Sequence, residues 1–116
     1  MQIKHMPGDG NCLFHSLSYP NGNHRMVRAC TVRYISTHWD DLKYFVATEE
    51  RGHYIRNMIR PGTWGDELVL RAFSDLAQRR VNVYSSMGEI ISTYGAYGLT
   101  ISVRFSGGHY DVIVAQ

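Results

Sequence analysis

A cysteine that follows a glycine-rich turn is the first group in this chain that could do chemistry. The run Gly8-Asp9-Gly10-Asn11 leads directly into Cys12, and Asp9 or Asn11 suits the N-cap of a short helix opened by Cys12. A helix N-terminus favours a thiolate, which is the nucleophilic form of cysteine. The turn also leaves backbone N–H groups free to converge on one point, as an oxyanion hole requires. The same pattern fits a buried apolar cysteine after an ordinary loop, so this segment alone leaves both interpretations open.

A histidine and an aspartate far along the chain are the groups that such a nucleophile needs. His109 follows Gly107-Gly108 and opens a run rich in β-branched residues, and Asp111 stands two residues later. Because side chains alternate along a strand, His109 and Asp111 point to the same side. A carboxylate there can hold one imidazole nitrogen and leave the other for a thiol. The alternative is a surface histidine in a hairpin, and we expect no catalytic role for the other histidines, His5, His15, His24, His38 and His53.

The elements that must position these groups are helices first and strands afterwards. Apolar spacing and breakers predict helices over His24–His38, Asp40–Val46, Thr48–Arg60 and Asp66–Arg80. Short runs rich in Val, Ile, Tyr and Thr, punctuated by glycines, predict strands over Val81–Ser85, Glu89–Tyr94, Leu99–Phe105 and His109–Ala115. This order is typical of an α+β domain with a small, mainly antiparallel β-sheet. The second cysteine, Cys30, falls on the apolar side of the first long helix.

Length and composition fit one globular domain over residues 1–116, with 44% apolar and 19% charged residues. The net charge of +2 is too small to favour nucleic acid as a partner. No apolar run approaches the roughly 20 residues that span a membrane, and no secretory signal is visible. Two cysteines are too few for a disulfide-stapled secreted domain. We therefore expect a monomer in the cytoplasm, or in the host-cell cytosol if the chain comes from a virus or parasite.

A metal site is not indicated. Cys12, His15 and Cys30 lack the paired spacing of zinc ligands, and a cysteine nucleophile with a histidine base needs no cofactor. We expect neither a metal nor a cofactor.

Three motifs together resemble the ovarian-tumour (OTU) family of cysteine proteases. Asp9-Gly10-Asn11-Cys12-Leu13-Phe14 is similar to the catalytic cysteine motif of that family, and His109-Tyr110-Asp111 is similar to its histidine motif. Trp64-Gly65-Asp66-Glu67-Leu68 looks like the Trp-Gly element that opens the helix between them. The three occur in the family's order, over nearly the whole chain. His15 and Asp66 depart from the pattern, since many relatives carry arginine and a second glycine there.

The resemblance implies a papain-like OTU fold and a set of residue roles. Cys12 would be the nucleophile, His109 the general base and Asp111 the group that orients the histidine. The backbone N–H groups of Asp9, Gly10, Asn11 and Cys12 would include the oxyanion donors. The implied activity is that of a deubiquitinase, a thiol protease or isopeptidase that cuts after the C-terminal glycine of ubiquitin or a ubiquitin-like protein.

The resemblance also implies a narrow channel for a substrate tail that ends in Gly-Gly. Trp64 and Tyr110 are the candidate walls of that channel, with core aromatics as the alternative interpretation. Two other functions stay open: a catalytically inactive ubiquitin-binding module on the same fold, and a protease that processes a viral or mobile-element polyprotein. The presence of Cys12, His109 and Asp111 together favours an active enzyme.

Overall fold

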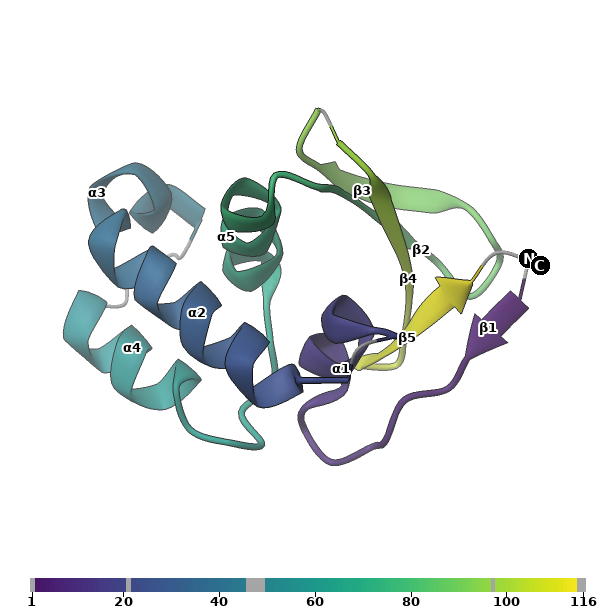
Figure 1. Cartoon of the computed structure of the whole chain (residues 1–116), viewed down its shortest axis with the longest axis horizontal. Coiled ribbons are helices and arrows are strands. Elements are labelled where there is room, and N and C mark those ends of the chain that lie inside the picture. Colours follow the sequence, from purple (N-terminus) through teal and green to yellow (C-terminus); the bar gives the residue numbers. More distant parts are fainter. Residues whose placement is uncertain (1, 21, 46–49, 97, 115–116) are drawn as a thin grey trace.

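Five α-helices and five strands make up the part of the chain that the computed structural model describes, residues 2–20, 22–45, 50–96 and 98–114. The helices are α1 (Cys12–Ser18), α2 (His24–Thr37), α3 (Trp39–Leu42), α4 (Arg51–Met58) and α5 (Glu67–Ala77), with a 3-10 turn at Lys43–Phe45 after α3. The strands are β1 (Gln2–Lys4), β2 (Arg80–Tyr84), β3 (Ile90–Tyr94), β4 (Thr100–Ser106) and β5 (His109–Val114). Helices α2 to α5 lie on one side of the molecule and the sheet on the other (Figure 1).

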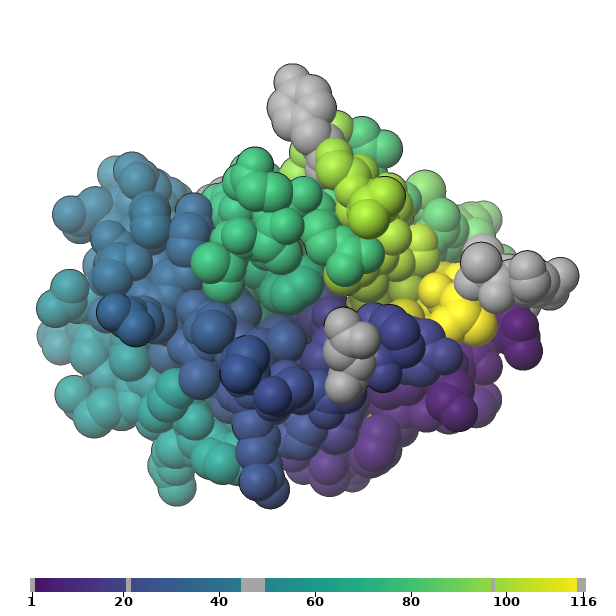
Figure 2. Space-filling view, viewed as in Figure 1, coloured from purple at the N-terminus to yellow at the C-terminus, as the bar shows by residue number. Residues whose placement is uncertain are grey.

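The sheet order is β1-β5-β4-β2-β3, so the last strand lies between the first strand and β4. Strands β2 and β4 are parallel, whereas the other three pairs are antiparallel. The prediction of an α+β fold with a mainly antiparallel sheet is therefore confirmed. In the space-filling view the N-terminal segment, in purple, lies against β5, in yellow (Figure 2).

Helix α1 lies between the two halves of the molecule and packs against both β5 and α2 (Figure 1). Its Leu13 and Phe14 are at most 1% exposed. They join an apolar core that both halves contribute to, made of Ile35, Leu68, Val69, Val81 and Val103 among others. The helix that begins at Cys12 is thus held in place by the apolar core of the fold.

The predicted element ends differ from the observed ones by a few residues. Helix α5 begins one residue later than predicted because the Asp66 carboxylate caps it, accepting from the Val69 N–H at 3.0 Å. It ends at Ala77, because Gln78 adopts a left-handed conformation with φ of 54°. The predicted ends at Val46, Thr48 and Ala115 lie outside the described residues. Strand β1, which is only three residues long, was not predicted.

The prediction that Cys30 faces the core is wrong, since Cys30 is exposed. Helix α2 instead turns Arg28, Thr31, Val32 and Ile35 inward, at the spacing i, i+3, i+4 and i+7. Ile35 is fully buried as predicted, and Val27 and Tyr34 pack against the core in part, so the predicted apolar face fails at Cys30. The apolar pattern missed Arg28 and Thr31 because they are polar.

Within the described ranges, no helix combines the length and the apolar character needed to cross a membrane.

Candidate active site

Cys12 is the first residue of α1, and its side chain is almost buried, at 7% exposure. The backbone N–H of Tyr110 in β5 donates to its Sγ at 3.3 Å. This contact joins residues 98 positions apart in the sequence. The packing of α1 on β5 therefore brings the predicted nucleophile next to the strand that begins with His109.

A cavity of about 120 Å³ is lined by residues from both the N-terminal and the C-terminal part of the chain. Its lining residues are Gly8, Gly10, Cys12, Trp64, Gly107, Gly108 and His109. The predicted nucleophile and the predicted base thus border one space, together with the Trp-Gly element. Because four of the seven lining residues are glycines, the walls leave room for an extended backbone close to the thiol.

The His109 ring is held by Asp111, with 2.8 Å between Nε2 and Oδ1. Burial alone would raise the pKa of Asp111, but hydrogen bonds from the Met6 N–H, His109 and Arg104 outweigh it and hold the pKa below its ordinary value. An ionised carboxylate can only accept, so Nε2 carries the proton. Nδ1 is then the nitrogen that remains for chemistry at the cavity.

The Asp111 carboxylate has further partners that the sequence reasoning missed. The Met6 N–H donates to Oδ1 at 2.8 Å, Arg104 donates to Oδ2 at 3.2 Å, and His5 Nδ1 lies 3.4 Å from Oδ2. A signal for Arg104 was available in the sequence. A hairpin centred on Gly107-Gly108 pairs Arg104 with Asp111 across the two strands, as observed.

The loop before Cys12 has its own internal bonds. The Asn11 N–H donates to Asp9 Oδ1 at 3.0 Å, and this bond is the largest influence holding the pKa of Asp9 below its usual value. This bond occupies the Asn11 N–H, which is one of the oxyanion donors that the family resemblance implies. Among the described residues we find no hydrogen bond from the N–H of Asp9, Gly10 or Cys12, so these three stay predicted oxyanion donors.

This loop also docks onto the segment that carries Trp64. Gly10 has φ of +83°, and a Cβ there would overlap the carbonyl oxygen of Gly62. The Asn11 Oδ1 accepts from the Gly62 N–H at 2.8 Å. Only glycine at position 10 permits this close approach, which sets the Trp64 segment beside the nucleophile.

Arg28 donates hydrogen bonds to the loop before Cys12, to the segment before Trp64 and to the end of α4. Its side chain is buried, at 4% exposure, and it donates to Asn11 Oδ1 at 2.7 Å, to the Thr63 carbonyl at 2.9 Å and to the Met58 carbonyl at 2.8 Å. The guanidinium also lies 4.1 Å from the centre of the Phe14 ring. Burial lowers the pKa of Arg28 from its ordinary value. Sequence reasoning missed it because arginine on a helix normally indicates a solvent-facing side.

We expect Arg28→Ala to destabilise the fold by about 3–5 kcal/mol, since it removes the guanidinium donor from the carbonyls of Met58 and Thr63 and one of the two donors to Asn11 Oδ1. Arg28→Lys should recover only part of the loss, because an ammonium cannot reproduce the forked geometry. The measurement is the free energy of unfolding in urea. Arg25→Ala, at an exposed position on the same helix, is the control and should change stability by less than about 0.5 kcal/mol. An equal, small loss for both alanine variants would contradict the role of Arg28.

Trp64 and Tyr110 lie on a groove of about 370 Å³ that shares Trp64 and Gly108 with the small cavity. Trp64 is 66% exposed. A Cβ on Gly108 would come within 3.0 Å of the Trp64 ring, so the glycine lets the indole lie against the histidine loop. Tyr110 is only 9% exposed, packs against Phe105, and has its pKa raised to about 12, mainly by burial. The two aromatic residues therefore differ: one stands on the surface, and the other belongs to the core.

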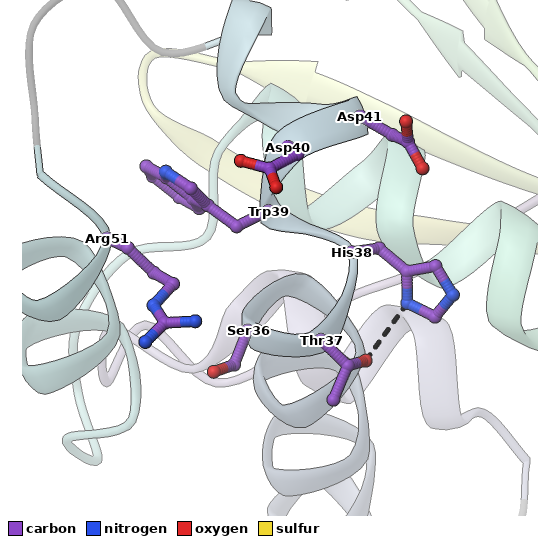
Figure 3. Close-up of a pocket in the computed structure, with 7 residues that line it drawn as sticks. All are labelled: Ser36, Thr37, His38, Trp39, Asp40, Asp41 and Arg51. Atoms are coloured by element: carbon purple, nitrogen blue, oxygen red, sulfur yellow. Dashed lines mark hydrogen bonds between the residues drawn. The ribbon is translucent and has the colours of Figure 1, made fainter.

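A second hollow, of about 380 Å³, lies at the far end of α2 (Figure 3). Its lining residues are Ser36, Thr37, His38, Trp39, Asp40, Asp41 and Arg51. In this hollow, Nδ1 of His38 lies 3.0 Å from the hydroxyl oxygen of the neighbouring Thr37. The hollow contains no cysteine among its lining residues, and none of the predicted site residues borders it. Size alone therefore does not identify the reactive site.

Comparison with known proteins gives the same family throughout. The model of the OTU-like cysteine protease family matches residues 7–105, a range that includes Cys12 and Trp64 and ends before His109. OVARIAN TUMOR DOMAIN-containing deubiquitinating enzyme 10 of Arabidopsis thaliana is 33% identical over 85 residues, covering 70% of this chain. Ubiquitin thioesterase otu2 of Schizosaccharomyces pombe is 26% identical over 99 residues, covering 74%. The chain spans only 24% and 33% of the length of these two relatives.

Solved structures agree on the fold. The OTU domain of OTUD1 superimposes with a TM-score of 0.79 at 26% identity, covering 95% of this chain and 83% of that one. An OTU domain in complex with ubiquitin gives a TM-score of 0.84 at 18% identity, covering 96% of this chain and 67% of that one. The family model and the Arabidopsis relative, added to a fold shared with solved OTU domains, establish that the chain belongs to the OTU-like cysteine protease family.

Proposed function

We propose that this chain is a cysteine isopeptidase that hydrolyses the bond after the C-terminal glycine of ubiquitin or a ubiquitin-like protein. Cys12 is its nucleophile, His109 its general base and Asp111 the residue that orients His109. The observation that carries this proposal is the glycine-lined cavity that Cys12 and His109 border together. The relatives named ubiquitin thioesterase and deubiquitinating enzyme support the substrate class.

The proposed reaction has two stages. In the first, the Cys12 sulfur attacks the carbonyl carbon of the terminal glycine, and N–H groups from among those of Asp9, Gly10 and Cys12 stabilise the oxyanion. His109 holds the thiol proton and passes it to the departing lysine amine, so that a thioester remains on Cys12. In the second stage, His109 takes a proton from water, the hydroxyl attacks the thioester, and the thiol is released with the tail's carboxylate.

The groove beside the cavity suits the proposed substrate tail. A tail that ends in Gly-Gly fits between the glycines of the cavity wall, where a larger side chain would collide with the Trp64 ring. Farther along, Asp66 and Glu67 line the groove. Their carboxylates favour the arginine side chains that precede the glycines in the ubiquitin tail.

The experiment that tests this proposal uses ubiquitin with a C-terminal electrophile, together with a panel of di-ubiquitins and ubiquitin-like precursors. We expect one covalent adduct, at Cys12, and cleavage of at least one member of the panel. An adduct at the exposed Cys30 would contradict the choice of nucleophile. Ubiquitin binding without any adduct or cleavage would instead identify an inactive ubiquitin-binding module.

Trp64→Ala is expected to lower activity on a Gly-Gly tail and to narrow the preference for that tail over a Gly-Ala tail. One added methyl displaces the carbonyl from Cys12, and a misplacement of about 1 Å costs on the order of 10²-fold in rate. Removing the ring gives the methyl room and reduces that penalty. The measurement is the ratio of kcat/KM for the two tails in the wild type and in the variant.

Stability separates this role from a packing role. Because Trp64 is 66% exposed, Trp64→Ala should cost less than about 1.5 kcal/mol, well below the 3–5 kcal/mol of a core aromatic. Tyr110→Ala, at a buried position, is the matched comparison and should show the larger loss. An unchanged tail ratio with a large fall in stability would make Trp64 a structural residue.

A further inference from the structure

The two oxygens of the Asp111 carboxylate have separate sets of partners. Oδ1 accepts from His109 Nε2 and from the Met6 N–H, each at 2.8 Å. Oδ2 faces Arg104, whose terminal nitrogen lies at 3.2 Å, and His5, whose Nδ1 lies at 3.4 Å. One oxygen therefore serves the imidazole, while the other is held by side chains from outside β5.

The sheet itself places Arg104 for this contact. Arg104 of β4 is the direct partner of Asp111 of β5 in the antiparallel register. Side chains that oppose each other in this way lie on the same face within reach of one another. Among the described residues Asp111 is the one polar partner of Arg104, whose Nε is buried without a partner. Within the described ranges, the Arg104 side chain therefore donates to this carboxylate and to no other group.

Burial makes this ion pair stronger than the one with His5. The Asp111 side chain is 5% exposed and that of Arg104 is 27% exposed, whereas the His5 side chain is 75% exposed. Water and salt screen the exposed contact but act much less on the shielded one. The Met6 contact uses a backbone N–H, which almost any residue would supply. Arg104 is thus the side chain whose replacement tests the arrangement.

We propose that Arg104 is a positioning residue that holds Asp111 in place for His109 and takes up part of the carboxylate's charge. This inference rests on the proposed function, in which His109 moves a proton to and from Cys12. A carboxylate that served His109 alone would hold the imidazolium more tightly. Such an imidazolium gives its proton less readily to the leaving amine. Arg104 limits that effect and keeps Oδ1 aligned with Nε2.

The test compares Arg104→Gln, Arg104→Lys and Arg33→Gln, each also in a His5→Gln background that removes the other titratable group at Oδ2. Arg33 is exposed on α2 and controls for the loss of one positive charge. Cys12 is alkylated with iodoacetamide across a range of pH. The reaction is followed on the Cys12 peptide by mass spectrometry, because the exposed Cys30 also reacts. Alkylation needs a thiolate but no ubiquitin, so it stands independently of the proposed substrate.

Removing a positive charge near the histidine and the thiol should move the alkylation midpoint to higher pH. We expect a shift of about half a pH unit for Arg104→Gln and none for Arg104→Lys or Arg33→Gln. On a ubiquitin reporter, kcat should fall on the order of 10-fold in Arg104→Gln, with KM within twofold of wild type. In an Asp111→Asn background, the same substitution should cause no further loss of kcat, because it acts through the carboxylate.

An Arg104→Gln profile that coincides with those of wild type and Arg33→Gln would overturn the proposal, and so would a full additional loss of kcat in the Asp111→Asn background. If Arg104→Gln does not fold, Arg104→Lys provides the test. The folded lysine variant should keep the wild-type pH dependence of Cys12 alkylation, and a displaced pH dependence would refute the charge-sharing role. A wild-type protein that cleaves no ubiquitin conjugate, yet shows the shift in Arg104→Gln, would contradict the proposed substrate and leave the role of Arg104 intact.

Discussion

Replacing Cys12 with alanine is expected to abolish turnover of a ubiquitin-fused reporter while the protein stays folded. Without the sulfur no acyl-enzyme forms, and the loss of a nucleophile of this kind lowers the rate by on the order of 10³-fold or more. The measurement is kcat/KM for the wild type and the variant. Within the described residues the Sγ makes one hydrogen bond, from the Tyr110 N–H, so the stability cost should be only about 1 kcal/mol.

The other cysteine is the matched control for this experiment. Cys30 is exposed on α2, so Cys30→Ala should leave kcat/KM unchanged and alter the free energy of unfolding by less than about 0.5 kcal/mol. Retained turnover in Cys12→Ala, with loss in Cys30→Ala, would reverse the assignment of the nucleophile.

Replacing His109 with alanine is expected to be as damaging as Cys12→Ala, on the order of 10³-fold or more in kcat/KM. In the proposed reaction the imidazole both removes the thiol proton and supplies a proton to the leaving amine, so both stages would lose their base and acid. The double variant Cys12→Ala/His109→Ala should be little worse than either single variant, because the two residues act in one step. Fully additive losses would mean that they do not share that step.

Asp111→Ala should be damaging but milder, by roughly 10- to 10⁴-fold, because the carboxylate orients the ring and does not take the proton. Its hydrogen bond to His109, at 2.8 Å, is what the variant removes. The measurement is kcat/KM with thermal unfolding alongside, since Met6 and Arg104 also lose their acceptor. Wild-type activity in Asp111→Ala would exclude it from the catalytic group.

The parts of the site that local sequence predicts are those that local geometry determines. The positions of glycines and β-branched residues predict a glycine-rich turn before Cys12 and a strand that begins with His109. The structure has both. That the two segments meet does not follow from either pattern. It depends on β5 packing against α1, which only the family resemblance implied. The place of β5 between β1 and β4 was not predicted.

The parts that the sequence did not predict depend on tertiary contacts. Arg28 is polar, and polarity on a helix indicates solvent unless acceptors from other segments surround the group, as Asn11, Met58 and Thr63 do here. Strand β1 has too few residues to show alternation, and pairing with β5 alone makes it a strand.

The place of β5 in the sheet bears on when the proposed site can assemble during synthesis of the chain. Strand β1 precedes the other described strands in the sequence, and the sheet order gives it a place at the edge, beside β5. Its pairing partner, β5, is the last of the five described strands in the sequence, and the Cys12 thiol contacts Tyr110 of that strand, 98 positions away. Folding that relies on such distant pairings is slow and cannot finish on a partial chain. A nascent chain that ends before β5 therefore carries the Cys12 thiol without His109, and under the proposed function no catalysis is expected before that strand is added.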